Sequence, residues 1–247
     1  MGHDCKDTSD RCVRRFEAGR IAPIDSQPQR PELRPGEGMI EGVSAVILAG
    51  GESRRMGNNK ALLPYRNGRF IDAVYRQMAA IFPEVILVTN TPELYQALPC
   101  RKVADLYPGM GALAGIHAGL HHSVNSYVFV VACDMPCLNS RLIRHLAARA
   151  EGHAVVVAES GSGVEPLHAL YSKDSLDSIE QMLAAGEKRV TALFPKVRLL
   201  QLPVAEIARL DPEFTSFRNI NTLEEYTRLR EQEKGGAGSP GDVPCSW

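Results

Sequence analysis

Two glycines and three basic side chains follow directly on an apolar run near residue 45. Gly50 and Gly51 come first, and Arg54, Arg55 and Lys60 follow closely. Glycine leaves backbone amides open to a bound anion, and cations this close repel one another unless anions or solvent compensate them. The pattern therefore indicates a phosphate-binding loop, with a plain turn and a solvated basic cluster as the alternative. It is not a Walker A loop, because no lysine-serine or lysine-threonine pair follows at the required spacing.

A carboxylate ends the most apolar run of the chain, residues 127–133, in the form of Asp134. A charge at the end of a buried strand is costly unless a cation meets it. Magnesium is such a partner, because it takes one or two carboxylates together with substrate phosphate oxygens. Asp134 is thus a candidate magnesium ligand, and a turn aspartate before Pro136 is the alternative. Asp105 precedes a Pro-Gly pair and fits an ordinary turn equally well.

Other patterns argue against zinc and dinucleotide sites. His117 and His121 have a spacing that suits zinc on a helix, but no HExxH motif or third ligand accompanies them. The six cysteines form no paired CxxC pattern. The stretch GMGALAG departs from a dinucleotide fingerprint in its glycine spacing. Asn219 and Asn221 precede a helical pattern, and their side chains are expected to cap it.

Strand and helix patterns alternate along the chain and must position these groups. Strands are expected over 44–50, 84–90, 126–134, 154–160, 167–172 and 197–204, and helices over 72–82, 113–122, 140–152, 175–186 and 221–234. Thr222 and Glu225 have capping-box spacing at the last helix. Such alternation predicts an α/β fold with one mostly parallel sheet and helices on both faces. Ligands of these sheets bind beyond the carboxyl ends of the strands, where Gly50, Asn90 and Asp134 are expected.

Composition bounds the class of protein. The 247 residues carry a net charge of −1 with 23% charged side chains, so no general footprint for nucleic acid exists. No apolar run is long enough to span a membrane, and the N-terminus lacks the apolar core of a signal peptide, so we expect a cytoplasmic protein without membrane contact. Residues 1–42 are proline-rich and aperiodic and are expected to form a disordered extension, followed by one domain over 43–232 and a flexible tail over 233–247.

Four stretches together, LAGGESRRMGNNKALL, CDMP, GEKRV and FRNINTLEEY, resemble the molybdenum cofactor guanylyltransferases over about residues 43–229. The first stretch marks the wider nucleotidyltransferase superfamily, and the other three point to the guanylyltransferase branch. The resemblance implies a Rossmann-like sheet of the glycosyltransferase-A type. It also implies transfer of GMP from GTP to the terminal phosphate of molybdenum-loaded molybdopterin, with release of pyrophosphate and with Mg²⁺ as the cofactor.

The resemblance also assigns roles to individual residues. Lys60, Asp134 and Arg55 are the expected catalytic residues, Asp134 is the expected magnesium ligand, and Asn219 and Asn221 are candidate pterin contacts. The expected nucleotide contacts are Leu48, Ala49, Gly50, Gly51, Lys60, Asp105 and Asp134. Transient contacts with other cofactor-biosynthesis proteins or recipient apoenzymes are a further expectation.

Three alternatives stay open at this point. A sister nucleotidyltransferase would use CTP or a sugar phosphate, and a non-catalytic carrier would only bind molybdopterin. A nicotinamide-dependent oxidoreductase is disfavoured by the failed glycine fingerprint and by the arginine pair after Gly51.

Overall fold

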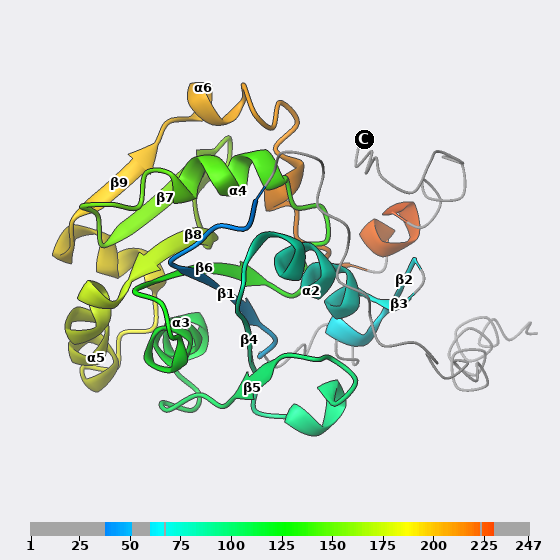
Figure 1. Ribbon diagram of the computed structural model, residues 1–247, viewed down its shortest axis with the longest axis horizontal. Helices are drawn as coiled ribbons and strands as arrows, with labels where there is room; N and C mark the ends of the chain where they lie inside the picture. Colours follow the sequence, from blue (N-terminus) through cyan, green and yellow to red (C-terminus); the bar gives the residue numbers. More distant parts are fainter. Residues whose placement is uncertain (1–37, 51–59, 67, 223, 230–247) are drawn as a thin grey trace, which may run out of the picture.

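A seven-stranded sheet forms the centre of the computed structural model, which describes residues 38–50, 60–66, 68–222 and 224–229. The strand order is β5-β4-β1-β6-β8-β7-β9 (Figure 1). Of these strands, β8 alone runs antiparallel to its neighbours, so the expectation of a mostly parallel sheet is confirmed. The bounds are β1 (Val43–Leu48), β4 (Val85–Val88), β5 (Arg101–Val103), β6 (Tyr127–Ala132), β7 (Val155–Ser160), β8 (Gly163–Ser172) and β9 (Leu199–Leu202).

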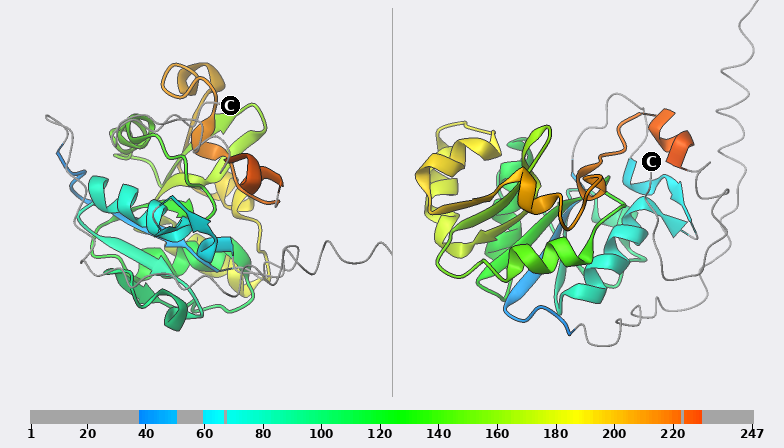
Figure 2. Two further views of the ribbon diagram at one scale, coloured as in Figure 1. Left: turned by 90° about the vertical axis from the view of Figure 1, so that its right-hand side faces the viewer. Right: turned by 90° about the horizontal axis from the view of Figure 1, so that it is seen from above.

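Helices cover both faces of the sheet (Figure 2). One face carries α2 (Phe70–Ile81), α4 (Ser140–Ala147) and the short α6 (Val204–Ile207), and the other carries α3 (Gly111–His122) and α5 (Leu176–Ala184). Alternation along β1 explains why both faces are apolar. Ala45 and Ile47 pack with the first set of helices, whereas Val46 and Leu48 pack with the second. The strand is therefore buried on both sides, as expected for the middle of a parallel sheet.

Helix α3 lies unusually close to β1, which explains its glycines. A Cβ atom added to Gly119 would lie 2.7 Å from two methyl carbons of Val46, and one added to Gly115 would lie 2.9 Å from a methyl carbon of Leu48. Gly115, the last glycine of GMGALAG, and Gly119, in the next turn of α3, therefore serve the close packing of the helix on β1. This agrees with the rejection of a dinucleotide fingerprint.

A separate apolar cluster, away from the sheet, packs the C-terminal helix, residues 224–229, against the hairpin of β2 (Pro64–Tyr65) and β3 (Gly68–Arg69). The Tyr226 hydroxyl donates to the Pro64 carbonyl at 2.6 Å, and the Tyr226 ring packs on Phe70. Thr222 and Glu225 form the expected capping box. Glu225 N donates to Thr222 Oγ1, and Thr222 N donates to Glu225 Oε2. The prediction for the start of this helix is confirmed.

Strand β5, helix α6 and the β2–β3 hairpin were not expected from the sequence. Each is short, and β5 reads Arg-Lys-Val at the edge of the sheet, where polar residues are tolerated because one side faces solvent. Such segments carry too little apolar periodicity to stand out.

Of the predicted N-terminal extension and C-terminal tail, residues 1–37 and 230–247 lie outside the described residues. The described residues just before β1 contact the domain. Ile40 N donates to the Ile81 carbonyl at 2.8 Å, and Arg144 donates to the Gly38 carbonyl at 2.6 Å. The chain is thus attached to the domain a few residues before the first strand.

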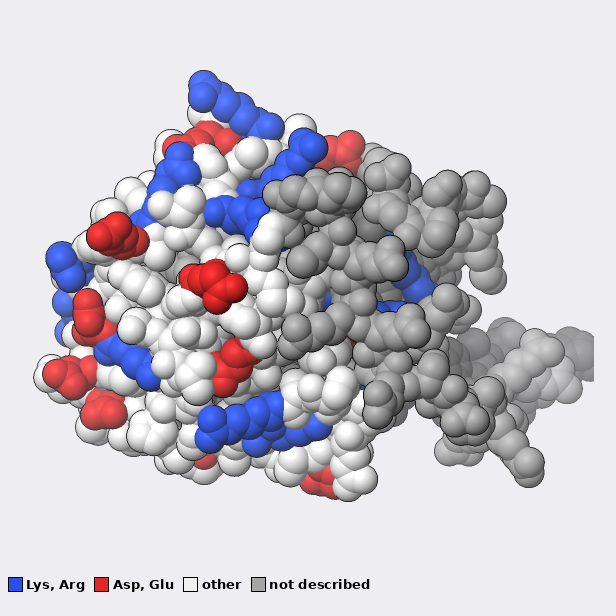
Figure 3. Space-filling model, in the orientation of Figure 1, with Lys and Arg blue, Asp and Glu red and all other residues white. Residues whose placement is uncertain are grey.

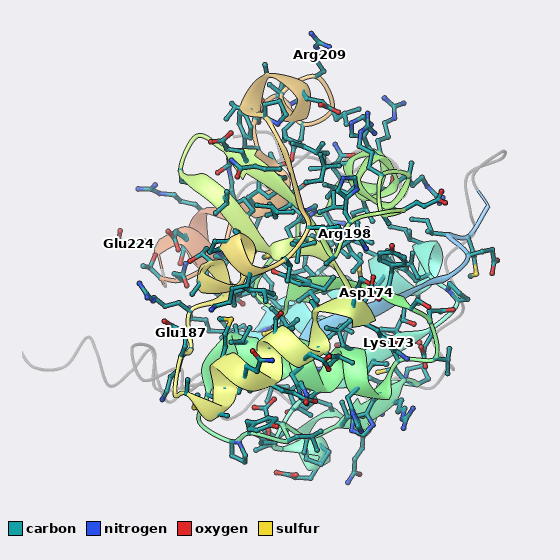
Figure 4. The ribbon with its side chains drawn as sticks, turned by 90° about the vertical axis from the view of Figure 1, so that its left-hand side faces the viewer. Lys173, Asp174, Glu187, Arg198, Arg209 and Glu224 are labelled. Carbon is teal, nitrogen blue, oxygen red and sulfur yellow. The ribbon has the colours of Figure 1, made fainter. Side chains whose placement is uncertain are left out.

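The described surface mixes charges of both signs. Basic and acidic side chains are interspersed on the face shown in Figure 3. On the flank shown in Figure 4, the exposed side chains of Asp174 and Arg198 approach to 3.5 Å. Within the described ranges, no helix combines the length and apolarity that crossing a membrane would require.

Candidate active site at the carboxyl edge of the sheet

Four neighbouring strands end at one edge of the sheet and place polar residues side by side. Asp105, Asn90, Gly50 and Asp134 each lie two residues beyond the last residue of β5, β4, β1 and β6. Because these strands are adjacent and parallel, the four positions lie at a similar height along one edge. The expected location of Gly50, Asn90 and Asp134 is confirmed.

A cation and a carboxylate meet at this edge. Lys60, at the start of the 3₁₀ helix η1 (Lys60–Leu62), places Nζ 3.9 Å from Asp134 Oδ2 and donates to Asn221 Oδ1 at 2.7 Å. The side chains of Lys60 and Asp134 are only 16% and 22% exposed. Burial raises the pKa of Asp134 above its usual value, and the charge of Lys60 lowers it in part. The carboxylate is thus held in a site where a further cation would stabilise its ionised form.

The C-terminal segment holds this pair in place. Ile220 N donates to the Asp134 carbonyl at 3.0 Å, and the next residue, Asn221, binds Lys60. The expectation that the Asn221 side chain caps the helix is wrong. Thr222 supplies the capping oxygen, which leaves the Asn221 amide to face Lys60. Asn219 is exposed nearby, and its carbonyl lies 3.5 Å from Asn221 Nδ2.

A second carboxylate is fixed at the far end of the same edge. Asn90 Nδ2 donates to Asp105 Oδ2 at 3.1 Å, and Asp105 N donates to Asn90 Oδ1 at 3.0 Å. Burial raises the pKa of Asp105, and the bond from Asn90 lowers it in part. Asp105 is therefore more than a turn residue, because a neighbouring strand orients it. Sequence reasoning placed Asn90 at the edge but missed this pairing, which only the order of β4 and β5 reveals.

The predicted nucleotide loop is described only in its first part. Leu48 and Ala49 are buried, and Gly50 is exposed at the end of β1. Gly51 and Arg55 lie outside the described residues, as does Arg54. Leu48 also touches the helix α3 through Gly115, whose added Cβ would lie 3.8 Å from Asp105 Oδ1.

The carboxylate of Asp134 suits a hard cation that is also bound by phosphate oxygens of a substrate. No group of three or more His, Cys, Asp or Glu side chains that could hold a metal ion is found within the described ranges. His117 instead pairs with Glu180 at 3.0 Å. Magnesium needs only one or two carboxylates when phosphate oxygens complete its shell, and Asp134 supplies a carboxylate of that kind. The described residues therefore fit the expected Mg²⁺.

Comparisons with known proteins agree on one family. A model of the MobA-like NTP transferase domain matches residues 45–200. A molybdenum cofactor guanylyltransferase of Syntrophotalea carbinolica is 37% identical over 194 residues, which cover 78% of this chain and 92% of the relative. Another, of Desulfosudis oleivorans, is 36% identical over 199 residues, 80% of this chain and 98% of the relative.

A solved structure carries the same fold. The crystal structure of molybdopterin-guanine dinucleotide biosynthesis protein A from Archaeoglobus fulgidus has a TM-score of 0.69 at 25% identity, covering 78% of this chain and 100% of that one. The resemblance drawn from the sequence motifs is confirmed. This chain belongs to the MobA-like NTP transferase family and is a nucleotidyltransferase of molybdenum cofactor biosynthesis, grouped with the molybdenum cofactor guanylyltransferases.

Proposed function

We propose that this enzyme transfers GMP from GTP to the terminal phosphate of molybdenum-loaded molybdopterin. The products are the molybdopterin guanine dinucleotide form of the cofactor and pyrophosphate. The names of the relatives support the two substrates. The observation that carries the proposal is the pairing of Lys60 with Asp134 at the carboxyl edge, held together by Asn221.

The reaction requires little covalent chemistry from the protein. An oxygen of the acceptor phosphate forms a bond to the α-phosphorus of GTP, and the bond from that phosphorus to the bridging oxygen breaks. The electron pair leaves with pyrophosphate. Both reactants are anions, so the barrier is mainly one of positioning and charge compensation.

Each proposed contact has a physical reason. The backbone at Gly50 is open to a phosphate group, and Lys60 brings a positive charge within reach of the same edge. Asn221 and Asp134 orient the lysine, so less side-chain freedom is lost when the triphosphate binds. Asp105, oriented by Asn90, offers acceptor oxygens to the nucleoside. Arg55 and Gly51 complete the proposed set from the sequence.

Asp134 would hold Mg²⁺, which when bound neutralises charge on the triphosphate oxygens. Asp134 would also orient the ammonium group of Lys60 toward the leaving group. The carboxylate is suited to this role because burial keeps water from competing for it.

Pyrophosphate release measured with each of the four nucleoside triphosphates, with and without molybdopterin, tests the proposal. Release should require GTP and molybdopterin together, and the product should have the mass of the guanine dinucleotide. Release with CTP in preference to GTP, or with a sugar phosphate as acceptor, would refute the substrate assignment. Tight molybdopterin binding without turnover under any nucleotide would instead identify a carrier.

A further inference from the structure

A cavity lies at the same edge, on the other side of Asp134 from the nucleotide residues. It has a volume of about 270 Å³ and lies between the β7–β8 turn, residues 160–162, and the side chains of Glu213, Phe214, Phe217 and Arg218. Since β7 runs parallel to β6, this turn lies at the carboxyl edge too. In the strand order, β5, β4 and β1 lie on one side of β6, and β8 and β7 lie on the other.

Hydrogen bonds within the protein hold the segment 211–217, which forms one wall of the cavity, in place. The buried Asp211 carboxylate accepts three hydrogen bonds, from Thr215 N, Thr215 Oγ1 and Ser216 N, at 2.9 to 3.1 Å. Asn139 N donates to Ser216 Oγ at 3.0 Å, which ties the same segment to the start of α4. Phe214 has a φ of +53°, a left-handed conformation that a bulky residue rarely adopts. Backbone strain of this kind recurs at ligand sites.

The back of the cavity is aromatic and apolar. Phe217, in the 3₁₀ helix η5 (Thr215–Phe217), is 7% exposed and lies 6.3 Å from Phe214 between ring centroids. Behind it the fully buried His168 ring meets Phe217 edge-on at 5.0 Å. Both nitrogens of His168 lack a hydrogen-bond partner among the described residues, and burial lowers its pKa to about 4. The ring is thus neutral, and it contributes no positive charge behind the aromatic wall.

The front of the cavity is polar. Ser160 and Ser162 both donate to Glu165 Oε1, which fixes the turn. Glu213 contributes an exposed carboxylate, and Arg218 a half-buried guanidinium. Two aromatic side chains with polar groups at the rim form a site for a flat heteroaromatic ring with hydrogen-bonding edges.

The same segment joins this cavity to the candidate active site. Three residues after Phe217, Ile220 donates to the Asp134 carbonyl, and Asn221 binds Lys60. The β7 and β6 strands are two positions apart in the sheet, which corresponds to about 10 Å at the usual strand spacing. A molecule with its ring in the cavity would therefore place a phosphate-bearing side chain near Asp134.

We propose that this cavity binds the pterin ring of the acceptor, with the Phe214 and Phe217 rings against it and Glu213 accepting hydrogen bonds from its amino-pyrimidinone edge. The assignment rests on the proposed function. That edge presents adjacent N–H donors, which one carboxylate can accept together. Guanine has a similar edge, but the nucleotide residues lie across Asp134 on the β1, β4 and β5 side. The volume, below the roughly 300 Å³ of typical small-molecule sites, suits a fused ring and not a nucleoside triphosphate.

Two cavity variants and one control test the assignment in steady-state turnover. Glu213→Gln keeps the size of the side chain and removes its charge, and Phe214→Leu removes the ring. Glu224→Gln, on the exposed side of the C-terminal helix (Figure 4), is the matched control. Glu213→Gln should raise the KM for molybdopterin by about tenfold or more, as loss of a charge-assisted contact does. Phe214→Leu should raise the same KM by a smaller factor, about twofold to tenfold, because it removes an aromatic contact. The KM for GTP should stay unchanged, and Glu224→Gln should match the wild type.

A direct binding measurement separates this assignment from the proposed function. Quenching of the fluorescence of free 2-amino-4-oxopteridine reports ring binding without turnover, and the wild-type enzyme should bind this pteridine more tightly than Glu213→Gln. A wild-type enzyme that binds the pteridine through Glu213 but makes no pyrophosphate would refute the proposed function alone. A folded Glu213→Gln enzyme with wild-type pteridine affinity and wild-type molybdopterin KM would overturn the cavity assignment. So would an equal rise in the KM for GTP, which would identify the cavity as the guanine site.

Discussion

Replacing Asp134 with asparagine separates a catalytic carboxylate from a structural one. At 3.9 Å, the attraction between Lys60 and Asp134 is worth about 4 kcal/mol at the effective dielectric constant near protein surfaces. The direction of the pKa shift shows that burial opposes ionisation more strongly than Lys60 favours it. Asp134→Asn removes both effects, so the melting temperature of the metal-free protein should stay the same or rise.

Turnover should respond in the opposite way. Asparagine keeps the shape of the side chain but not the charge that would hold Mg²⁺ and orient Lys60. Loss of one preorganised electrostatic contact commonly lowers kcat by about 10²–10³-fold. We therefore expect at least that loss in Asp134→Asn, together with a higher Mg²⁺ requirement. A structural turn residue would give the reverse, a less stable protein with near-normal kcat.

The assay combines thermal melting with kcat measured over a magnesium titration. Asp174→Asn is the matched control, because its carboxylate is exposed and its partner Arg198 lies away from the site (Figure 4). Lys60→Met supplies a second check. It leaves Asp134 half-buried without its cation, so it should lower both turnover and stability, the latter by about 1–3 kcal/mol. A folded Asp134→Asn enzyme with wild-type kcat and an unchanged magnesium dependence would refute the reasoning.

Three further predictions concern the framework around the site. In the unfolded chain His168 takes up a proton below about pH 6.5, whereas the folded residue does so only near pH 4, because burial lowers its pKa. The free energy of unfolding should therefore fall by about 3 kcal/mol as the pH is lowered from about 6.5 to 4. Denaturant titrations across this pH range should show a smaller fall for His168→Leu. Gly119→Ala places a Cβ atom within 2.7 Å of Val46, and this overpacking should cost about 1–3 kcal/mol, more than the roughly 1 kcal/mol gained in helix propensity. The melting temperature should therefore fall, and an unchanged or higher melting temperature would contradict the close packing. A chain that begins at Met39 keeps the bond from Ile40 to α2 and loses the exposed bond from Arg144 to the Gly38 carbonyl, so its turnover should equal that of the full chain and its melting temperature should change little. A loss of turnover or a large fall in melting temperature would show that the preceding residues contribute.

The sequence predicted those features of the fold and the site that depend on residues close together in the chain. The run 127–133 is apolar because β6 is buried on both faces, and it forms the expected strand. The spacing of Thr222 and Glu225 predicted a capping box, because its hydrogen bonds span only three residues. The edge positions of Gly50 and Asp134 followed from the rule that parallel strands end together. These parts of the fold and the site need no knowledge of long-range contacts.

Contacts between distant segments were not predictable in this way. Lys60 and Asn221 are 161 positions apart, and nothing local distinguishes an asparagine that binds a lysine from one that caps a helix. Thr222 supplies the capping oxygen, and the packing of Tyr226 on the hairpin holds the start of this helix near Lys60, which Asn221 then binds. His168 gave no signal as a core residue either, because its burial depends on two aromatic rings from other segments.

In the seven-stranded sheet of the described residues, the antiparallel strand β8 separates the carboxyl edge into two parts. Parallel strands return to the carboxyl edge only after a crossover, so each contributes a strand end and a loop there. Strand β8 instead leaves that edge through the tight turn after β7, and this turn forms one wall of the cavity proposed to bind the pterin ring. In the proposed reaction, the nucleotide would lie over β1, β4 and β5, and the acceptor over β8 and β7. Asp134, at the end of β6, lies between the two parts, where an acceptor phosphate and the α-phosphorus would have to meet.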